Sequence, residues 1–381
     1  MRNPVSKTIL EVDNLSVRFF LETEKKLLPA LNRISFQVNE DEVLGIIGES
    51  GSGKSITLLS ILGLLQTSPG IIDGRIVFNT QNGIINTLQD IEQHFDINNF
   101  ESADEEITGK TTKWKKMLAK RYKYILGNEI SMVFQNPRLA FNPYYSIGKQ
   151  ISESILLHKP GTDKESAKNI AIDWLRRVKM EAPEIRYNNN PYGLSGGLCQ
   201  RAMIAMALAS EPRLLIADEP TTGLDATIQG DILTLLDELK TQQKLSMIIV
   251  SHDFNVMHRL ADRVLVYYKG FIIEEGNTED ILKLSSETHH PYTTLLLDTE
   301  FIQNTESYSE IKPDRIVSES YGDNDTDSSS SFFTKCPYAN DCRSITPDIT
   351  DKCSTALPPL ISIKGNKNGN HKIRCWKYQN A

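Results

Sequence analysis

A glycine-rich stretch at residues 48–55 constrains the fold of this chain more than any other feature. It consists of Gly-Glu-Ser-Gly-Ser-Gly-Lys-Ser and follows a short apolar run at 43–47, which is typical of a buried strand. A helix is predicted directly after it, over residues 54–65. Glycines let backbone N–H groups turn inward around phosphate oxygens, and a helix start adds positive potential. The sequence therefore predicts a strand, a phosphate-binding loop and a helix, in that order.

The side chains of this loop have distinct expected tasks. Lys54 should reach the β and γ phosphates of a nucleoside triphosphate, and Ser55 should ligate Mg²⁺. The other predicted phosphate contacts come from Gly48, Ser50, Gly51 and Gly53.

An acidic pair ends a second apolar run, at residues 214–217. Ligands of open α/β sheets bind beside the carboxyl ends of the strands, so Asp218 is expected to hold Mg²⁺ directly or through water. Glu219 is then placed to polarise an attacking water. The pair could instead mark the start of a helix, but its presence together with the phosphate loop favours nucleotide hydrolysis. The two motifs do not separate a kinase, a helicase and a transporter subunit.

The rest of the chain predicts an α/β protein with a parallel sheet, because apolar strand-like runs alternate with helical ones. Strands are expected at 9–19, 34–38, 130–134, 245–250 and 264–268, and helices at 144–190, 199–209, 227–240 and 254–261. Residues 79–128 form a polar insertion, with a basic helix at 112–125, that should decorate the surface. Residues 301–331 are predicted to be a linker, and 332–381 a small separate module with four of the five cysteines.

Composition narrows the class of protein further. The net charge of −7 gives no electrostatic footprint for nucleic acid. No apolar stretch is long enough to cross a bilayer, and the N-terminal residues lack the apolar core of a signal peptide. A cytoplasmic location is expected, with cysteines that are reduced or bind a metal.

Four further motifs carry a resemblance to a known family. The segment 194–200, Leu-Ser-Gly-Gly-Leu-Cys-Gln, resembles the signature of ABC ATPases. Gln135 resembles the glutamine of their Q-loop, residues 223–225 their D-loop, and His252 their switch histidine. All six motifs occur in the family's order, and the resemblance covers residues 8–300.

This resemblance implies a P-loop NTPase with a RecA-like core, an antiparallel β subdomain and a helical subdomain at about 140–200. Two such domains would pair head to tail, so that the signature turn acts on the partner's ATP. Gln135 would sense the γ phosphate and the Mg²⁺, and His252 would contact the γ phosphate beside Glu219. Phe19, or alternatively Phe20, would stack on adenine. The signature residues concerned are Ser195, Gly196, Gly197 and Gln200.

Residues 132–143, the His-Pro-Tyr-Thr-Thr-Leu-Leu stretch at 290–296 and the cysteine tail resemble the oligopeptide, dipeptide and nickel importer ATPases. That resemblance implies a subunit on the cytoplasmic face of the membrane. Its partners would be a second ATPase chain, two permease subunits and, indirectly, a solute-binding protein. Nickel or another small solute is the alternative cargo. The chain could also be a soluble ABC ATPase of DNA repair or translation, or an inactive regulatory module.

The tail presents four thiols that could share a metal site. Their spacing suits zinc or an iron–sulfur cluster without choosing between them. The importer ATPases suggest a [4Fe-4S] cluster in some members, but Ser330 replaces a usual cysteine here and Cys342 is extra. Reduced structural thiols are the alternative. The residues are Cys336, Cys342, Cys353 and Cys375.

Overall fold

Parallel strands buried on both faces form the centre of the main sheet. They are β3 (Val43–Ile47), β6 (Ile130–Val133), β7 (Leu214–Asp218), β8 (Ser246–Val250) and β9 (Arg263–Tyr268). Antiparallel strands β10 (Phe271–Asn277), β12 (Lys372–Ile373) and β11 (Ile361–Ser362) extend it. The order is β11-β12-β10-β9-β3-β8-β7-β6. The computed structural model describes residues 7–21, 26–65, 70–90, 116–283, 288–304, 336–340, 342, 347–363 and 371–379.

Successive residues of the central strands belong to two different hydrophobic clusters. In β3, Leu44 and Ile46 pack into one cluster, while Val43 and Ile47 pack into the other. This alternation follows from the two-residue period of a strand, and a parallel sheet must be covered on both faces. The continuous apolar runs that predicted these strands are therefore explained by burial on both sides.

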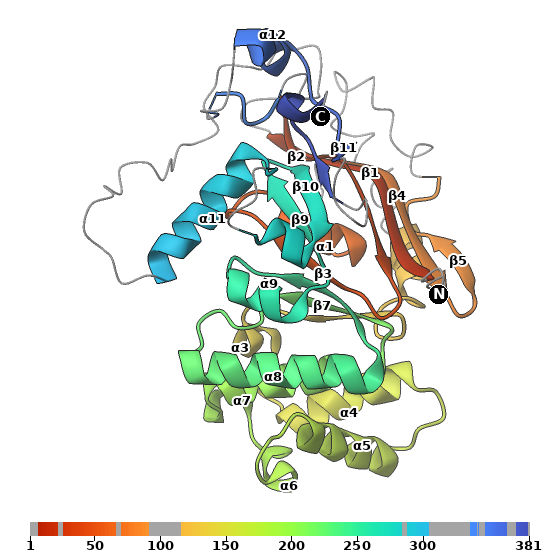
Figure 1. The fold of residues 1–381 in the computed structure, drawn as a ribbon. Coiled ribbons are helices and arrows are strands. Elements are labelled where there is room, and N and C mark those ends of the chain that lie inside the picture. The colour runs from red at the N-terminus through yellow and green to blue at the C-terminus, as the bar shows by residue number, and fades with distance from the viewer. Residues whose placement is uncertain are drawn as a thin grey trace, which may run out of the picture.

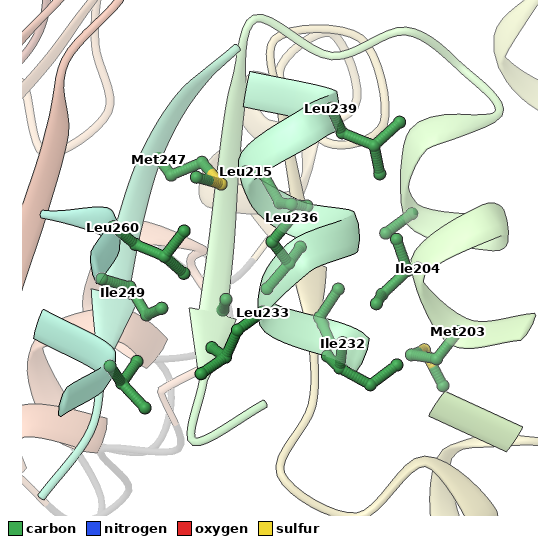
Figure 2. Packing of buried hydrophobic residues seen from close by; sticks show 14 of the residues in the cluster. Met203, Ile204, Leu215, Ile232, Leu233, Leu236, Leu239, Met247, Ile249 and Leu260 are labelled. Carbon is green, nitrogen blue, oxygen red and sulfur yellow. The ribbon is translucent and has the colours of Figure 1, made fainter. Parts of the chain in front are cut away.

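Three helices cover one face of this sheet: α7 (Gly196–Leu208), α8 (Ala226–Gln243) and α9 (Phe254–Leu260). Figure 2 shows Leu233 and Leu236 of α8 toward Leu215 and Ile249 of the strands. Figure 2 also shows the other side of α8, where Ile232 and Leu239 face Met203 and Ile204 of α7. The helix thus joins the sheet to the helical region below it in Figure 1.

The opposite face packs against α1 (Lys54–Ile61) and a second, antiparallel sheet in the order β2-β1-β4-β5. These strands are β1 (Thr8–Leu21), β2 (Lys26–Asn39), β4 (Gly70–Thr80) and β5 (Gly83–Asn86). The helix α1 is shorter than the predicted 54–65, because the chain turns at Gly63 with a φ of 64°. The ring of Tyr122 lies where a side chain at that position would be.

The described end of the inserted segment is part of the core. Its helical residues 116–122 carry Leu118 and Tyr122, which are buried together with Ile125 in the same cluster as α1. The hydroxyl of Tyr122 donates to the carbonyl oxygens of Ser60 (3.2 Å) and Ile61 (2.8 Å). The prediction that this insertion decorates the surface is therefore wrong for residues 116–125. Residues 91–115 lie outside the described part.

The helical region lies at one end of the molecule (Figure 1). Side chains cap two of its helices: Ser146 accepts from the N–H of Lys149, and Asp163 accepts from Glu165 and Ser166. Trp174, 1% exposed, packs in its core as an apolar residue should. The elements are α3 (Pro137–Ala140), α4 (Ile147–His158), α5 (Lys164–Arg177), α6 (Pro183–Arg186) and η3 (Pro191–Gly193).

The C-terminal elements lie at the other end of the molecule (Figure 1). They are α11 (Pro291–Asn304), α12 (Pro347–Thr355) and η4 (Trp376–Tyr378), while the short helix α10 (Thr278–Ile281) directly follows β10. The cysteine segment continues the main sheet, because β12 pairs with β10 through Ile373 and Lys372. Residues 305–335, which include most of the predicted linker, lie outside the described part, so the domain boundaries stay predictions.

A buried carboxylate joins this C-terminal segment to the rest of the chain. Glu274 of β10 is 0% exposed, and its Oε1 lies 2.8 Å from His289 Nδ1 and 2.7 Å from His371 Nε2. The three ligand atoms lie within 4.8 Å of one another, close enough for a metal ion. However, the two short separations are those of hydrogen bonds to a carboxylate. The backbone N–H of His290 donates to the second oxygen at 2.8 Å.

This cluster predicts a pH-dependent contribution to stability. Burial raises the pKa of Glu274, but hydrogen bonds from His289 and His371 outweigh it and lower the pKa from 4.5 to about 2. The ionised carboxylate therefore stabilises the fold above pH 4.5. Its stabilising contribution is lost as the pH falls toward 2. Burial lowers the pKa of His289, but Glu274 raises it above 6.5. That stabilisation is present below pH 6.5 and is lost as the pH rises through the raised value.

We therefore expect wild type and Glu274→Gln to differ most in free energy of unfolding between pH 4.5 and 6.5. The difference should shrink on either side. Urea unfolding across this pH series would measure it, and a difference that does not change with pH would contradict the assignment. Asp163→Asn, at an exposed helix cap, serves as the control: hydrogen bonds from Ser166 lower the pKa of Asp163 below 3.8, so its difference from wild type should stay constant from pH 4.5 to 6.5 and beyond.

Candidate nucleotide site

The phosphate loop joins the end of β3 to the start of α1, as its sequence predicts. Gly48 has a φ of 151°, and a Cβ there would collide with the carbonyl oxygen of Tyr267. Gly53 has a φ of 104°, and a Cβ there would lie 2.7 Å from the side chain of Leu31. Only glycine fits both positions without strain. Ser50, Gly51 and Ser55 remain exposed at the surface of the loop.

Lys54 folds beneath this loop. Its ammonium donates to the carbonyl oxygens of Gly48 and Glu49, each at 2.7 Å, and the residue is only 7% exposed. Burial lowers the pKa of Lys54, while the carboxylates of Glu219, Asp218 and Glu49 oppose that shift. The lysine is thus a partly desolvated cation in a group of acidic residues.

Asp218 ends β7 next to this lysine. Burial raises its pKa, the neighbouring carboxylate of Glu219 raises it further, and Lys54 lowers it. Two carboxylates with one ammonium carry excess negative charge, which a divalent cation would neutralise. The residues therefore fit a Mg²⁺ ion held by Asp218 and the exposed hydroxyl of Ser55, two of the three predicted ligands, while the side-chain amide of the third, Gln135, is bonded to Glu219.

Glu219 is the point where motifs from distant parts of the chain meet. The side-chain amide of Gln135 donates to its Oε2 at 2.7 Å, and His252 Nδ1 lies 3.3 Å from its Oε1. The backbone N–H of Glu219 donates to the carbonyl of Val250 at 2.9 Å, which ties the residue to β8. The structure therefore brings together the three predicted catalytic residues.

Thr222 is a polar partner of this carboxylate that the sequence did not single out. Its hydroxyl donates to Oε2 of Glu219 at 3.0 Å. It follows the acidic pair in a short turn, and nothing in the local residue pattern distinguishes it from Thr221. Glu219 itself has a φ of 44°, an unusual backbone conformation for a residue with a side chain. Together these contacts aim the carboxylate toward Gln135 and His252.

The signature turn lies apart from the phosphate loop of its own chain. Ser195 caps α7 by accepting from the N–H of Leu198 at 3.4 Å, which starts that helix three residues earlier than the predicted 199. The residues of α7 pack in one hydrophobic cluster, whereas those of α1 pack in the other. Ser195 is exposed and Gly197 is buried against Ile228. A turn placed in this way can meet a nucleotide on a second subunit.

The positions of Gln200 and Phe19 bear on two predicted contacts with the nucleotide. Gln200 is 2% exposed, so its side chain lies inside α7's packing rather than on the surface of the signature turn. Phe19 lies near the end of β1, opposite Leu28 and Gly70, and is partly buried against the second cluster. Its contact with adenine stays a prediction, and the side chain of Phe20 lies outside the described part.

Comparison with known proteins decides the family. Residues 31–222 match the family described as "ABC transporter". The chain belongs to the ABC transporter family. Its ATP-binding subunits are ATPases coupled to transport, and this chain is such an ATPase. Among the described residues, none of the helices has the length and apolar character to cross a membrane.

Similar proteins extend over nearly all of this ABC cassette and its tail. "Dipeptide transport ATP-binding protein DppD" of Haemophilus influenzae is 37% identical, covering 92% of this chain and 96% of the relative. "Oligopeptide transport ATP-binding protein AppD" of Bacillus subtilis is 35% identical, covering 98% and 97%. The dimeric ATP-binding cassette MJ0796 bound to ADP and phosphate has a TM-score of 0.54 at 24% identity, covering 71% of this chain and 99% of that one. The last comparison confirms the α/β cassette fold.

Glu219→Gln tests the assignment of the carboxylate. Glutamine keeps the shape of the side chain but cannot take a proton, so ATP should still bind while hydrolysis falls about 10²- to 10⁴-fold. Phosphate release and binding of labelled ATP would measure the two effects. Glu211→Gln, an exposed residue near the other end of β7, is the matched control. Hydrolysis by Glu219→Gln at the wild-type rate would exclude this carboxylate as the base.

Proposed function

We propose that this chain drives the import of oligopeptides or dipeptides, as one of two ATPase chains on the cytoplasmic face of a membrane transporter. The observation that carries the ATPase role is the single carboxylate of Glu219 held by Gln135 and His252 beside Lys54. The peptide class is supported by relatives named for dipeptide and oligopeptide transport, whose similarity to this chain covers nearly its whole length.

In the proposed cycle Lys54 and the loop N–H groups bind the phosphates of ATP. Ser55 and Asp218, with Gln135 nearby, would hold Mg²⁺, which would supply charge neutralisation at the phosphates. Glu219 accepts a proton from the attacking water. His252 and Gln135, both in contact with Glu219, hold that carboxylate in place. His252 also contacts the γ phosphate, and Gln135 senses whether it is bound. The supporting observation is the convergence of these groups at the carboxyl ends of the parallel strands β3, β6, β7 and β8.

The separation of the two glycine-containing motifs supports a paired cassette. The exposed Ser195 at the start of α7 would complete the ATP site of a second chain, either a copy or a sibling. Transmembrane permease subunits would dock beside the helical region, near Gln135, and a solute-binding protein would deliver the peptide to them.

The cysteine segment is proposed to hold a [4Fe-4S] cluster. Burial and, to a smaller extent, the other three thiols of the segment raise the pKa of Cys375 to about 11, so all four lie within electrostatic reach. The cluster is proposed in place of zinc because the importer ATPases that this chain resembles include members with a [4Fe-4S] cluster. Bound iron would displace the thiol protons and offset the repulsion between the resulting thiolates.

Uptake by cells tests the transport role. Deleting the gene should abolish uptake of labelled di- and oligopeptides, and the wild-type chain should restore it. Lys54→Ala should restore less than about a tenth of the uptake, because the phosphates lose their buried cation. Lys164→Ala, an exposed lysine at the start of α5, should restore all of it. If the deletion strain takes up peptides normally but has lost nickel uptake, the cargo is nickel. If it takes up both normally, the importer role is refuted.

Metal analysis tests the cysteine proposal. Protein purified without oxygen should contain about four irons per chain and absorb visible light as iron–sulfur proteins do. Cys353→Ser, which removes a buried thiol, should lose both signals. Cys199→Ser, in α7, should keep them. Zinc in place of iron, or neither metal, would exclude the cluster.

A further inference from the structure

Three tyrosines from distant parts of the chain form a buried group beside the phosphate loop. Tyr292 of α11 lies 4.6 Å from Tyr268 at the end of β9, measured between ring centroids. Tyr338, two residues after Cys336, meets both rings edge-on at 5.2 Å and 5.7 Å. Tyr292 is 1% exposed and Tyr338 is 6% exposed. The group therefore connects the cysteine segment to the core of the cassette.

The hydroxyl of Tyr292 reaches the phosphate loop itself. Its oxygen accepts the backbone N–H of Glu49 at 3.1 Å. That N–H belongs to the same peptide group as the carbonyl of Gly48, which accepts the ammonium of Lys54 at 2.7 Å. Because a peptide group is planar, holding its N–H also fixes the direction of its carbonyl. Tyr292 therefore acts on one end of a rigid unit, and Lys54 is bound to the other.

The ring that carries this hydroxyl is itself held on several sides. The backbone N–H of Tyr292 donates to His290 Nδ1 at 3.1 Å, and the His290 ring lies 5.5 Å from that of Tyr338. Burial raises the pKa of Tyr292, so its phenol stays protonated and neutral at physiological pH. A neutral, immobile hydroxyl is suited to fix a backbone group without adding charge near the phosphates.

We propose that Tyr292 is a positioning residue for the phosphate loop, and that Tyr338 of the cysteine segment holds it in place. The inference rests on the proposed ATPase function and adds to its nucleotide site a residue outside the six motifs shared with ABC ATPases. It also gives the cysteine segment a role in that site, because displacement of Tyr338 would release the ring that orients the Gly48–Glu49 peptide. ATP affinity is then expected to depend on the state of a segment far away in sequence.

Tyr292→Phe in the full-length chain tests the first step, because it removes the hydroxyl and keeps the ring. The dissociation constant for ATP, measured by displacement of a fluorescent ATP analogue, should rise about fivefold, the loss of one backbone hydrogen bond. Tyr187→Phe is the matched control, since it removes a buried phenol that pairs with Ser152 at 3.0 Å in the helical region. It should lower the melting temperature similarly and leave ATP affinity unchanged.

Tyr338→Leu tests the second step. It should also raise the dissociation constant for ATP. In the double variant with Tyr292→Phe, the loss of binding free energy should be smaller than the sum of the two single losses, because both substitutions act through one contact. Wild-type affinity in Tyr292→Phe, an equal loss in Tyr187→Phe, or full additivity in the double variant would overturn the inference. Failure of the wild-type chain to bind ATP would instead refute the proposed function.

Discussion

The pairing of β3, β7 and β8 determines where the phosphate loop, the acidic pair and His252 lie. The three strands are parallel, so their carboxyl ends meet at one edge of the sheet. The phosphate loop follows β3, the acidic pair ends β7, and His252 follows β8. In the register of the sheet, Asp218 lies opposite Val250, whose carbonyl accepts the N–H of Glu219. A shift of one residue in this pairing would turn the carboxylate away from Gln135 and His252.

Much of this arrangement could be predicted from the sequence because its signals are local. A glycine loop between an apolar strand and a helix indicates phosphate binding wherever it occurs, and residues 43–47 form a strand with the predicted bounds. Continuous apolar runs indicate strands buried on both faces. The ends of helices were harder to predict. The end of α1 depends on Gly63 and the ring of Tyr122, which comes from a segment some 60 residues later.

The residues that sequence reasoning missed owe their roles to contacts between distant segments. The inserted segment looks polar as a whole, yet Leu118 and Tyr122 fill a gap beside α1. Tyr292 lies in the stretch that resembles the importer ATPases, but nothing in that stretch indicates its contact with Glu49, 243 positions away. Likewise, nothing in the local sequence marks Glu274 in its strand or His371 in the tail as partners. Only the folded sheet brings the two side chains together. The periodic pattern of apolar residues, which predicts helices and strands, carries no information about such long-range contacts.

The short strand β12 has a consequence for the outer edge of β10. It pairs with Glu274 and Glu275, and the next residue, Arg374, adds hydrogen bonds to the carbonyl oxygens of Ile272 and Ile273. A strand whose edge groups are unpaired is a template on which another molecule can add its own strand. The tail therefore occupies hydrogen-bonding groups along β10, and a chain shortened after α11 would leave them unpaired at the edge of the sheet.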